Sequence, residues 1–510
     1  MKKNLIPIVI VMLFSSMAYA TDVTSTAVAA DGLDFNAALA HSFESSGKVK
    51  QALYDLKSAE GTVEKTYSMF DLMATGSVNY TESKTESSSP FSPEETKVLV
   101  YSAGLSNKIF TGGFLSLDFS SARTSIFFPP ASPYFPIDPS LLSSYNPTYK
   151  PVLSISLVQP LLKDFWGRPD EKAIKIGELT VALAKEGLRG AVLENVSSLK
   201  DAYFFIYLSD KMLEVQRDFY SDAESLYNET KSLQKIGLRE ETDLLQAKAS
   251  LLSSKSEISS AEVQAKFARE NYLNMAGYPQ EEWDSKNIIV SDAPEDIQAP
   301  ETMDSGAEDR LIDAQPAVIM SKMGAEMSKI GKEMADSSAL PSLNVIGSYG
   351  IEGTDGDMSR AFDKMDDNKF RNFMVGVNMS YSFPNRGGAG EVKIRENEMM
   401  KAEDNFGSLK NTLRIGIRAA YRKLQTAKMD YELKKEARGL LEKRLKIQEK
   451  SFSQGRISTR ELIMSQSEYH GARLKEAAAI LEYVKAGSAW NMMTGKYDVY
   501  YNEYLTKIKN

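Results

Sequence analysis

Two glycine-centred phrases recur at a fixed spacing and restrict the fold of this chain more than any other feature of its sequence. "KIGLREETDLLQAKAS" contains Gly237, and "SQGRISTRELIMSQSE" contains Gly455, which lies 218 positions later. Gly277 in "NMAGYP" and Gly495 in "MMTGKY" have the same separation. An ungapped offset shared by two landmarks indicates that the chain contains two copies of one structural unit.

Long, almost proline-free stretches rich in Ala, Glu, Lys, Leu and Gln precede both phrases, and this composition is typical of helices. Gly237 and Gly455 can take the left-handed conformation that ends a helix. The polar residues that follow suit the first turn of a second helix. The sequence therefore predicts two long helical hairpins, residues 170–277 and 388–495, with tips at these glycines.

Four other segments alternate between apolar and polar residues, near residues 72–82, 151–160, 341–351 and 372–383. Their length fits a tilted transmembrane strand with an apolar outer face. Half-buried strands of a soluble sandwich would alternate in the same way. The long hairpins offer no obvious layer to cover such a sandwich. If the strands span a membrane, copies of the chain must close the sheet, because lipid cannot satisfy open strand edges; the pattern does not choose the number of copies.

An insertion over residues 83–150 separates the first two of these strands. It contains a strand, turn and strand over residues 97–120, followed by a proline-rich loop at 127–139. We expect this hairpin to project outside the membrane, with two further barrel strands as the alternative. The other strand pair is joined by an acidic segment, residues 351–370, which we expect to be a solvated loop rather than a weak cation site.

The N-terminus has the layout of a cleaved secretory signal peptide. Lys2 and Lys3 precede an apolar run, and "AYA" ends at Ala20. A membrane anchor is the alternative, but the run is too short to span a bilayer comfortably. We therefore expect a signal peptide at residues 1–20 and two structural repeats, residues 21–302 and 303–510.

Charge and composition exclude several functions. The net charge is −8, and it becomes −10 without Lys2 and Lys3, which argues against nucleic acid as a partner. The sequence has no cysteine, which excludes disulfides, a thiol nucleophile and a lipid attached to cysteine. It also lacks the G-x-x-x-x-G-K-[ST] loop that binds nucleotide phosphates.

No residue pattern indicates catalysis, a metal site or a cofactor. The two histidines, His41 and His470, lie in separate predicted helices, and we interpret both as residues on helix surfaces. The many carboxylates belong to charged helices, and nothing indicates a pocket that would shift their pKa values. A non-enzymatic protein is predicted.

In order, these features resemble the TolC family of outer-membrane efflux proteins. The resemblance rests on the two tip phrases, the "MAGYP" and "MMTGKY" endings, "LPSLNVIGSYG" at 340–350, "QPLL" at 159–162 and "FPNRGG" at 383–388. It implies a mainly α protein with membrane β structure. The family's homotrimer has a 12-stranded outer-membrane β-barrel, four strands per chain, which continues into a long α-helical barrel across the periplasm.

The resemblance also implies a function. Such channels are passive exit ducts in the outer membrane of Gram-negative bacteria, used for efflux or type I secretion. They work with a periplasmic adaptor protein and an inner-membrane transporter of the RND, ABC or MFS type. The cargo could be a drug, a metal or a protein, and no residue indicates which. A soluble periplasmic coiled-coil scaffold without a pore is the alternative function.

In this family the helix tips form a gate at the periplasmic entrance. The resemblance assigns Thr242 and Asp243 to gate bonding and Glu461 to an acidic ring, where three copies would favour cations. Phe452 stands where the family often has a tyrosine, Met464 replaces a second acid, and the nearby arginine, Arg456, is shifted by one position. The surface that the adaptor would contact comprises Gly237, Leu238, Gly455 and Arg456.

Overall fold

The computed structural model describes residues 33–86, 92–128, 145–288, 290, 305–367 and 369–509. The expected signal peptide, most of the proline-rich loop and the expected boundary between the repeats at residue 302 lie outside the described residues. Within the described part of the chain, no helix is both long and apolar enough to cross a bilayer.

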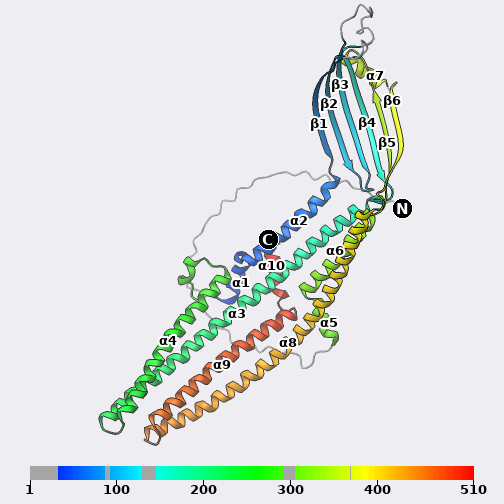
Figure 1. Ribbon diagram of the computed structural model, residues 1–510. Coiled ribbons are helices and arrows are strands. Elements are labelled where there is room, and N and C mark those ends of the chain that lie inside the picture. Colours follow the sequence, from blue (N-terminus) through cyan, green and yellow to red (C-terminus); the bar gives the residue numbers. More distant parts are fainter. Residues whose placement is uncertain are drawn as a thin grey trace, which may run out of the picture.

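Four long helices form two hairpins that lie side by side (Figure 1). The first pairs α3, Arg168–Lys235, with α4, Glu241–Ala276. The second pairs α8, Arg386–Ser453, with α9, Thr459–Met493. Helices α3 and α8 each have 68 residues and are therefore about 100 Å long. Because α3 also packs against α9, the two hairpins contact each other along their length.

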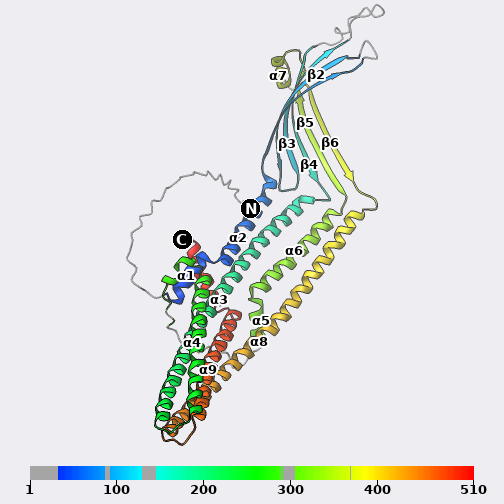
Figure 2. The same cartoon turned by 60° about the vertical axis from the view of Figure 1, so that its left-hand side comes forward.

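Shorter helices complete the region between the hairpins and the sheet. Helix α2 leads into the first strand and α6 into the fifth, so that α2, α3, α6 and α8 lie next to one another beneath the sheet (Figure 2). The elements are α1 (Phe35–Ser45), α2 (Gly47–Tyr67), η1 (Ser68–Phe70), η3 (Phe165–Gly167), η4 (Gln280–Ser285), α5 (Ser305–Asp313), α6 (Pro316–Ser338) and α10 (Asp498–Lys509).

The strands form one antiparallel sheet in the order β1-β2-β3-β4-β5-β6 at the far end of the molecule from the helix tips (Figure 1). Every neighbouring pair along the sheet is also consecutive in the chain. The strands are β1 (Met73–Lys84), β2 (Glu95–Lys108), β3 (Phe114–Phe127), β4 (Thr148–Pro160), β5 (Ser342–Glu352) and β6 (Arg371–Ser380).

This sheet corrects the expected number of strands. The sequence predicted four strands per chain, with the hairpin at residues 97–120 outside the membrane and two further barrel strands as the alternative. The sheet has six strands, and that hairpin forms β2 and β3 between β1 and β4. The alternation of β2 and β3 was visible in the sequence, but alternation does not identify a strand's partner. Here β1 pairs over its whole length with β2 and makes no pairing with β4.

The two faces of the sheet differ in polarity. On one face, serines from neighbouring strands form hydrogen bonds, Ser77 with Ser102 at 2.8 Å and Ser116 with Ser156 at 2.7 Å. The opposite face is apolar, and the described residues leave most of it exposed. Its exposed side chains include Val78, Tyr80, Leu105, Leu117, Ile155, Tyr349, Phe373 and Val375.

The acidic segment between β5 and β6 is folded, which corrects the expectation of a solvated loop. It contains α7, Met358–Asp366, with Asp357 as its N-cap. Asp355 binds Lys364 at 2.6 Å and Arg360 at 3.1 Å. The ring of Phe362 stacks on Phe119 of β3, with the ring centroids 5.9 Å apart. No group of three potential metal ligands occurs among the described residues, here or elsewhere.

The largest apolar core lies around α3, where helices of both hairpins meet. Leu199 and Ile206 of α3 are fully buried, and Tyr203 packs beside Tyr272 of α4. Leu481 and Val484 bring α9 into the same cluster. This core fixes α1, α4, α9 and α10 around one long helix, so the hairpins project as rods from a common base.

The stability of the fold should depend on pH because of one carboxyl group in this region, that of Asp201. Burial raises the pKa of Asp201 on α3 above its ordinary value, despite the nearby Lys485 ammonium. Because the folded-state pKa is raised, ionisation of Asp201 destabilises the fold as the pH rises above the ordinary carboxyl pKa of about 4. Asp201→Asn cannot ionise and should therefore be more stable than the wild type at neutral pH.

Thermal unfolding followed by far-UV circular dichroism would check this. The Asp201→Asn variant should have the higher midpoint at about pH 7, and the two midpoints should converge near pH 4, where the unfolded carboxyl becomes protonated. If the midpoint of Asp201→Asn exceeds that of the wild type by the same amount at both pH values, ionisation of Asp201 is not the cause of the difference.

Candidate gate at the helix tips

Both hairpin tips end their first helix in the same way. Gly237 has φ +79°. Its N–H donates to the Gln234 carbonyl and the Leu238 N–H donates to the Leu233 carbonyl, at 2.9 Å each. Gly455, with φ +71°, and Arg456 repeat this pattern. This arrangement satisfies helix-end carbonyls and requires a left-handed residue, for which glycine is best suited. Both tips are exposed.

Glu461 takes part in the start of α9. Its carboxylate accepts from the backbone N–H of Ser458 at 2.8 Å, while the Ser458 hydroxyl accepts from the Glu461 N–H at 3.3 Å. This reciprocal capping box satisfies two N–H groups that the helix leaves without partners. The Glu461 side chain is therefore a structural element of each chain, whatever else it contributes.

Thr242 and Asp243 occupy the corresponding first turn of α4. The Thr242 hydroxyl donates to Glu240 at 3.3 Å. No hydrogen bond or ion pair among the described residues joins Thr242 or Asp243 to the second tip, and Arg456 has none to the first. A single chain therefore does not bring these three predicted gate residues together.

The residue that joins the tips within one chain is Arg239, which the sequence analysis missed. Its guanidinium lies 4.7 Å from the centroid of the Phe452 ring and donates to the Ile457 carbonyl at 3.2 Å. Phe452 is 2% exposed and packs with Leu226, Leu445 and Leu462. Phe452 is thus the centre of an apolar cluster between the hairpins, and the arginine covers it.

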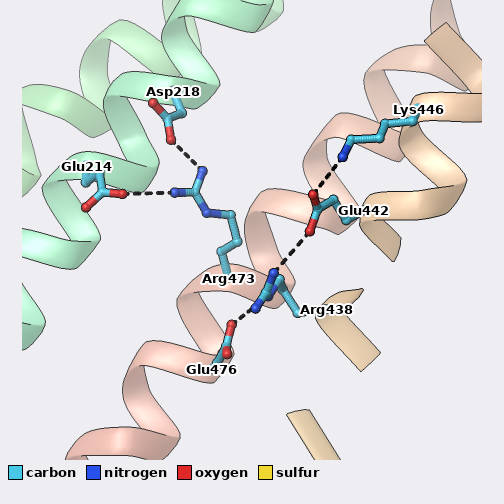
Figure 3. Close-up of polar contacts among 7 residues, drawn as sticks. All are labelled: Glu214, Asp218, Arg438, Glu442, Lys446, Arg473 and Glu476. Atoms are coloured by element: carbon cyan, nitrogen blue, oxygen red, sulfur yellow. Dashed lines mark hydrogen bonds and ion pairs between the residues drawn. The ribbon is translucent and has the colours of Figure 1, made fainter. Parts of the chain in front are cut away.

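Further contacts between α3 and α9 follow above the tips. His470 Nε2 lies 2.8 Å from the Asp222 carboxylate. The Arg473 guanidinium binds Asp218 at 2.6 Å and Glu214 at 3.4 Å (Figure 3). His470 is 3% exposed, which corrects its interpretation as a surface histidine. We call the contacts of Arg239, His470 and Arg473 with the opposite hairpin the inter-hairpin ladder.

A second group of charges holds the second hairpin together. Arg438 of α8 binds Glu476 of α9 at 2.9 Å and Glu442 at 3.1 Å, and Glu442 also binds Lys446 (Figure 3). These contacts stay within α8 and α9. Within the described part of the chain, the inter-hairpin ladder and the apolar packing beside it hold the second hairpin against the first at this level.

The spacing of charged residues in the sequence could have indicated part of the inter-hairpin ladder. Glu214, Asp218 and Asp222 are spaced four residues apart and therefore lie on one face of α3, while His470 and Arg473 lie one turn apart on α9. Complementary charges on the two helices could have suggested contact. The helices of this chain carry many such sets, however, and the sequence does not indicate that α3 faces α9.

Comparison with known proteins identifies a family and solved structures that share this architecture. A sequence model of the family "Outer membrane efflux protein" matches residues 140–277 and 331–495, more than half of the chain. A search of curated proteins found no match.

Several solved structures have the same fold. The CmeC outer membrane channel of Campylobacter jejuni is 16% identical, with a TM-score of 0.66, over 90% of this chain and 85% of that one. VceC of Vibrio cholerae is 13% identical, with a TM-score of 0.64, over 90% and 96%. A membrane protein of Pseudomonas aeruginosa is 13% identical, with a TM-score of 0.67, over 94% and 100%.

Proposed function

The chain belongs to the outer membrane efflux protein family, and from that premise we propose that it is the outer-membrane exit duct of a tripartite efflux or type I secretion system. It is an outer-membrane channel protein with a large periplasmic helical part, and not an enzyme. Export through it is passive, because the sequence has no phosphate-binding loop to supply energy. The energy comes from an inner-membrane transporter, whose type the chain does not indicate.

The observation that supports this function best is a sheet with one exposed apolar face joined end to end to helices about 100 Å long. Such a face is unfavourable in water and suits lipid. The outer strands β1 and β6 each have a free edge within the described chain. Because lipid cannot satisfy free edges, β1 of one copy pairs with β6 of the next.

Channels of this family form trimers and work with adaptor and pump partners. In a homotrimer, the six hairpin tips meet around the threefold axis at the periplasmic entrance. The exposed turns at Gly237, Leu238, Gly455 and Arg456 are then the surface that a periplasmic adaptor contacts. The inter-hairpin ladder holds the second hairpin against the first and so keeps the entrance closed. Adaptor binding opens it by favouring a different packing of the two rods.

Glu461 makes the entrance selective for cations in this proposal. Three copies around the axis place three negative charges near the pore. Glu461→Gln removes the charge but retains the cap, because glutamine can also complete a capping box. The cation-to-anion permeability ratio, measured from the reversal potential in a salt gradient, should fall toward unity. Glu503→Gln, on α10 far from the tips, should leave the ratio unchanged. A ratio unaffected by Glu461→Gln would remove Glu461 from the selectivity role.

Cell fractionation tests the proposed function against the alternative of a soluble periplasmic scaffold. The exit duct should sediment with the outer membrane, resist extraction by high salt and require detergent for release. A scaffold should appear in the periplasmic fraction. Recovery of the folded protein from the periplasm without detergent would overturn the proposal.

A further inference from the structure

The β2–β3 hairpin is the feature that the expected family architecture does not account for. It enters the sheet between β1 and β4, pairing with β1 over Met73–Lys84 and with β4 over Thr148–Val158. Both of its strands have 14 residues, more than the 9–11 that a tilted strand needs to cross a bilayer. Their length therefore suffices for a transmembrane position.

The side chains of the hairpin continue both faces of the sheet. Leu105 and Leu117 lie opposite each other, and Leu117 lies opposite Ile155 of β4. All three side chains are between 43% and 46% exposed on the same apolar face. On the other face, Ser116 bonds to Ser156 at 2.7 Å. A hairpin that projected into water would gain nothing from an exposed apolar face in register with its neighbours.

The helix-side end of the hairpin is tied to the helices below it. Asn107 donates to the Phe70 carbonyl at the end of η1, at 2.6 Å, and Lys108 binds Asp170 in the first turn of α3, at 2.6 Å. The turn also approaches η3 closely, since a Cβ atom on Gly167 would collide with the Phe110 carbonyl. These contacts bridge the chain entering β1 and the chain leaving β4, so the hairpin is part of the junction between sheet and helices.

We propose that β2 and β3 are membrane-spanning strands of the outer-membrane barrel, so that each chain contributes six strands and a trimer closes a barrel of eighteen. The proposal rests on the proposed function, because it requires insertion of the sheet into the outer membrane. The count follows from three copies of a six-stranded sheet.

The widths of the two parts of the molecule agree with this count. A strand tilted by about 40° with neighbours about 4.8 Å away occupies roughly 6 Å of a barrel's circumference. Six strands then cover roughly 37 Å, and four would cover roughly 25 Å. The four helices beneath the sheet, α2, α3, α6 and α8, cover roughly 32–40 Å at spacings of 8–10 Å. Six strands therefore match the width of that arc.

The consequence for transport is a wide exit. Eighteen strands give a barrel about 36 Å across between backbones, compared with about 24 Å for twelve, and barrels of 16–18 strands leave an aqueous channel. The outer-membrane section would then admit cargo as wide as a folded polypeptide segment. Selection by size would take place at the helix tips.

The absence of cysteine makes a direct test possible. Four single-cysteine variants are compared in cells: Leu117→Cys and Ser116→Cys on β3, and Ile155→Cys and Ser156→Cys on β4. The paired residues lie at the same level, since Leu117 is opposite Ile155 and Ser116 is opposite Ser156. The probe is a small, charged, membrane-impermeant maleimide, and a fluorescent hydrophobic maleimide confirms that each thiol is present.

In an eighteen-stranded barrel, the charged reagent reaches the lumen and labels Ser116→Cys and Ser156→Cys. It does not label Leu117→Cys or Ile155→Cys, because these two positions face lipid. Equal labelling of Leu117→Cys and Ser116→Cys, together with protection of Ile155→Cys, would overturn the proposal and leave the exit duct intact. Labelling of all four positions would show that the sheet does not enter a membrane, which would overturn the proposed function as well.

Discussion

The double variant Arg239→Ala/Arg473→Ala is expected to shift the channel strongly toward its open state. These two arginines make most of the polar contacts that connect the first hairpin to the second near the tips. Their removal leaves the packing within each hairpin unchanged. The closed arrangement should therefore lose stability relative to one in which the second hairpin has moved.

The size of the shift follows from the individual contacts. A cation over an aromatic face contributes about 0.5–2 kcal/mol, and one hydrogen bond about 1 kcal/mol. The ion pairs of Arg473 have half-exposed carboxylates, so they contribute about 0.5–1 kcal/mol after screening. A loss of about 2–4 kcal/mol per chain changes the ratio of closed to open states by roughly 30- to 900-fold. Concerted opening of three chains would enlarge the effect.

Single-channel recordings in planar bilayers would measure this shift as a larger mean conductance or a higher open probability. Lys266→Ala/Lys434→Ala is a matched control, because it also removes two cations that form ion pairs, but each pair lies within one helix and includes no residue of the ladder. The control should behave like the wild type. If the arginine variant forms trimers whose conductance and open probability equal those of the wild type, the inter-hairpin ladder does not hold the gate.

Ile155→Arg is expected to abolish assembly in the outer membrane, whereas Ser156→Arg should be tolerated. The two positions are adjacent on β4, but Ile155 lies on the apolar face and is 46% exposed, while Ser156 bonds to Ser116 on the opposite face. An arginine facing lipid near the middle of the bilayer costs about 2–4 kcal/mol per copy. Three copies would cost about 6–12 kcal/mol, comparable to the whole stability of a typical domain.

The readout is the amount of trimer in the outer-membrane fraction after mild detergent extraction. Ser156→Arg should reach wild-type levels, because its side chain would lie in the aqueous lumen. Equal loss of both variants would indicate general misfolding, and equal tolerance would indicate that the apolar face does not contact lipid.

The helical hairpins were accessible from sequence because their signals are local. Glycine at positions 237 and 455 suits a left-handed helix end, and the acid three residues after Ser458 suits a capping box. Such features need no knowledge of distant residues. The fold class predicted from them, long helices joined to membrane-type strands, agrees with the structure and with the related channels.

The remaining features depend on which segments meet. The sequence showed that residues 97–120 form a hairpin, but its place in the sheet depends on the pairing of β1 with β2 and on contacts such as Lys108 with Asp170. Likewise, the sequence compared Phe452 with the tyrosine that the family often has at this position. In the structure, its ring is buried under the Arg239 guanidinium. The role of Arg239 is defined only by the neighbouring hairpin, more than 200 positions away in sequence.

The most direct test of the exit duct is single-channel conductance of the purified protein in planar bilayers, with chemical crosslinking to count the subunits. The account predicts spontaneous insertion of a trimer with a small, cation-selective conductance in the closed state. A protein that crosslinks to another number of subunits but conducts would contradict the trimer alone. A protein that stays soluble and forms no channels would contradict the exit duct and favour the periplasmic scaffold.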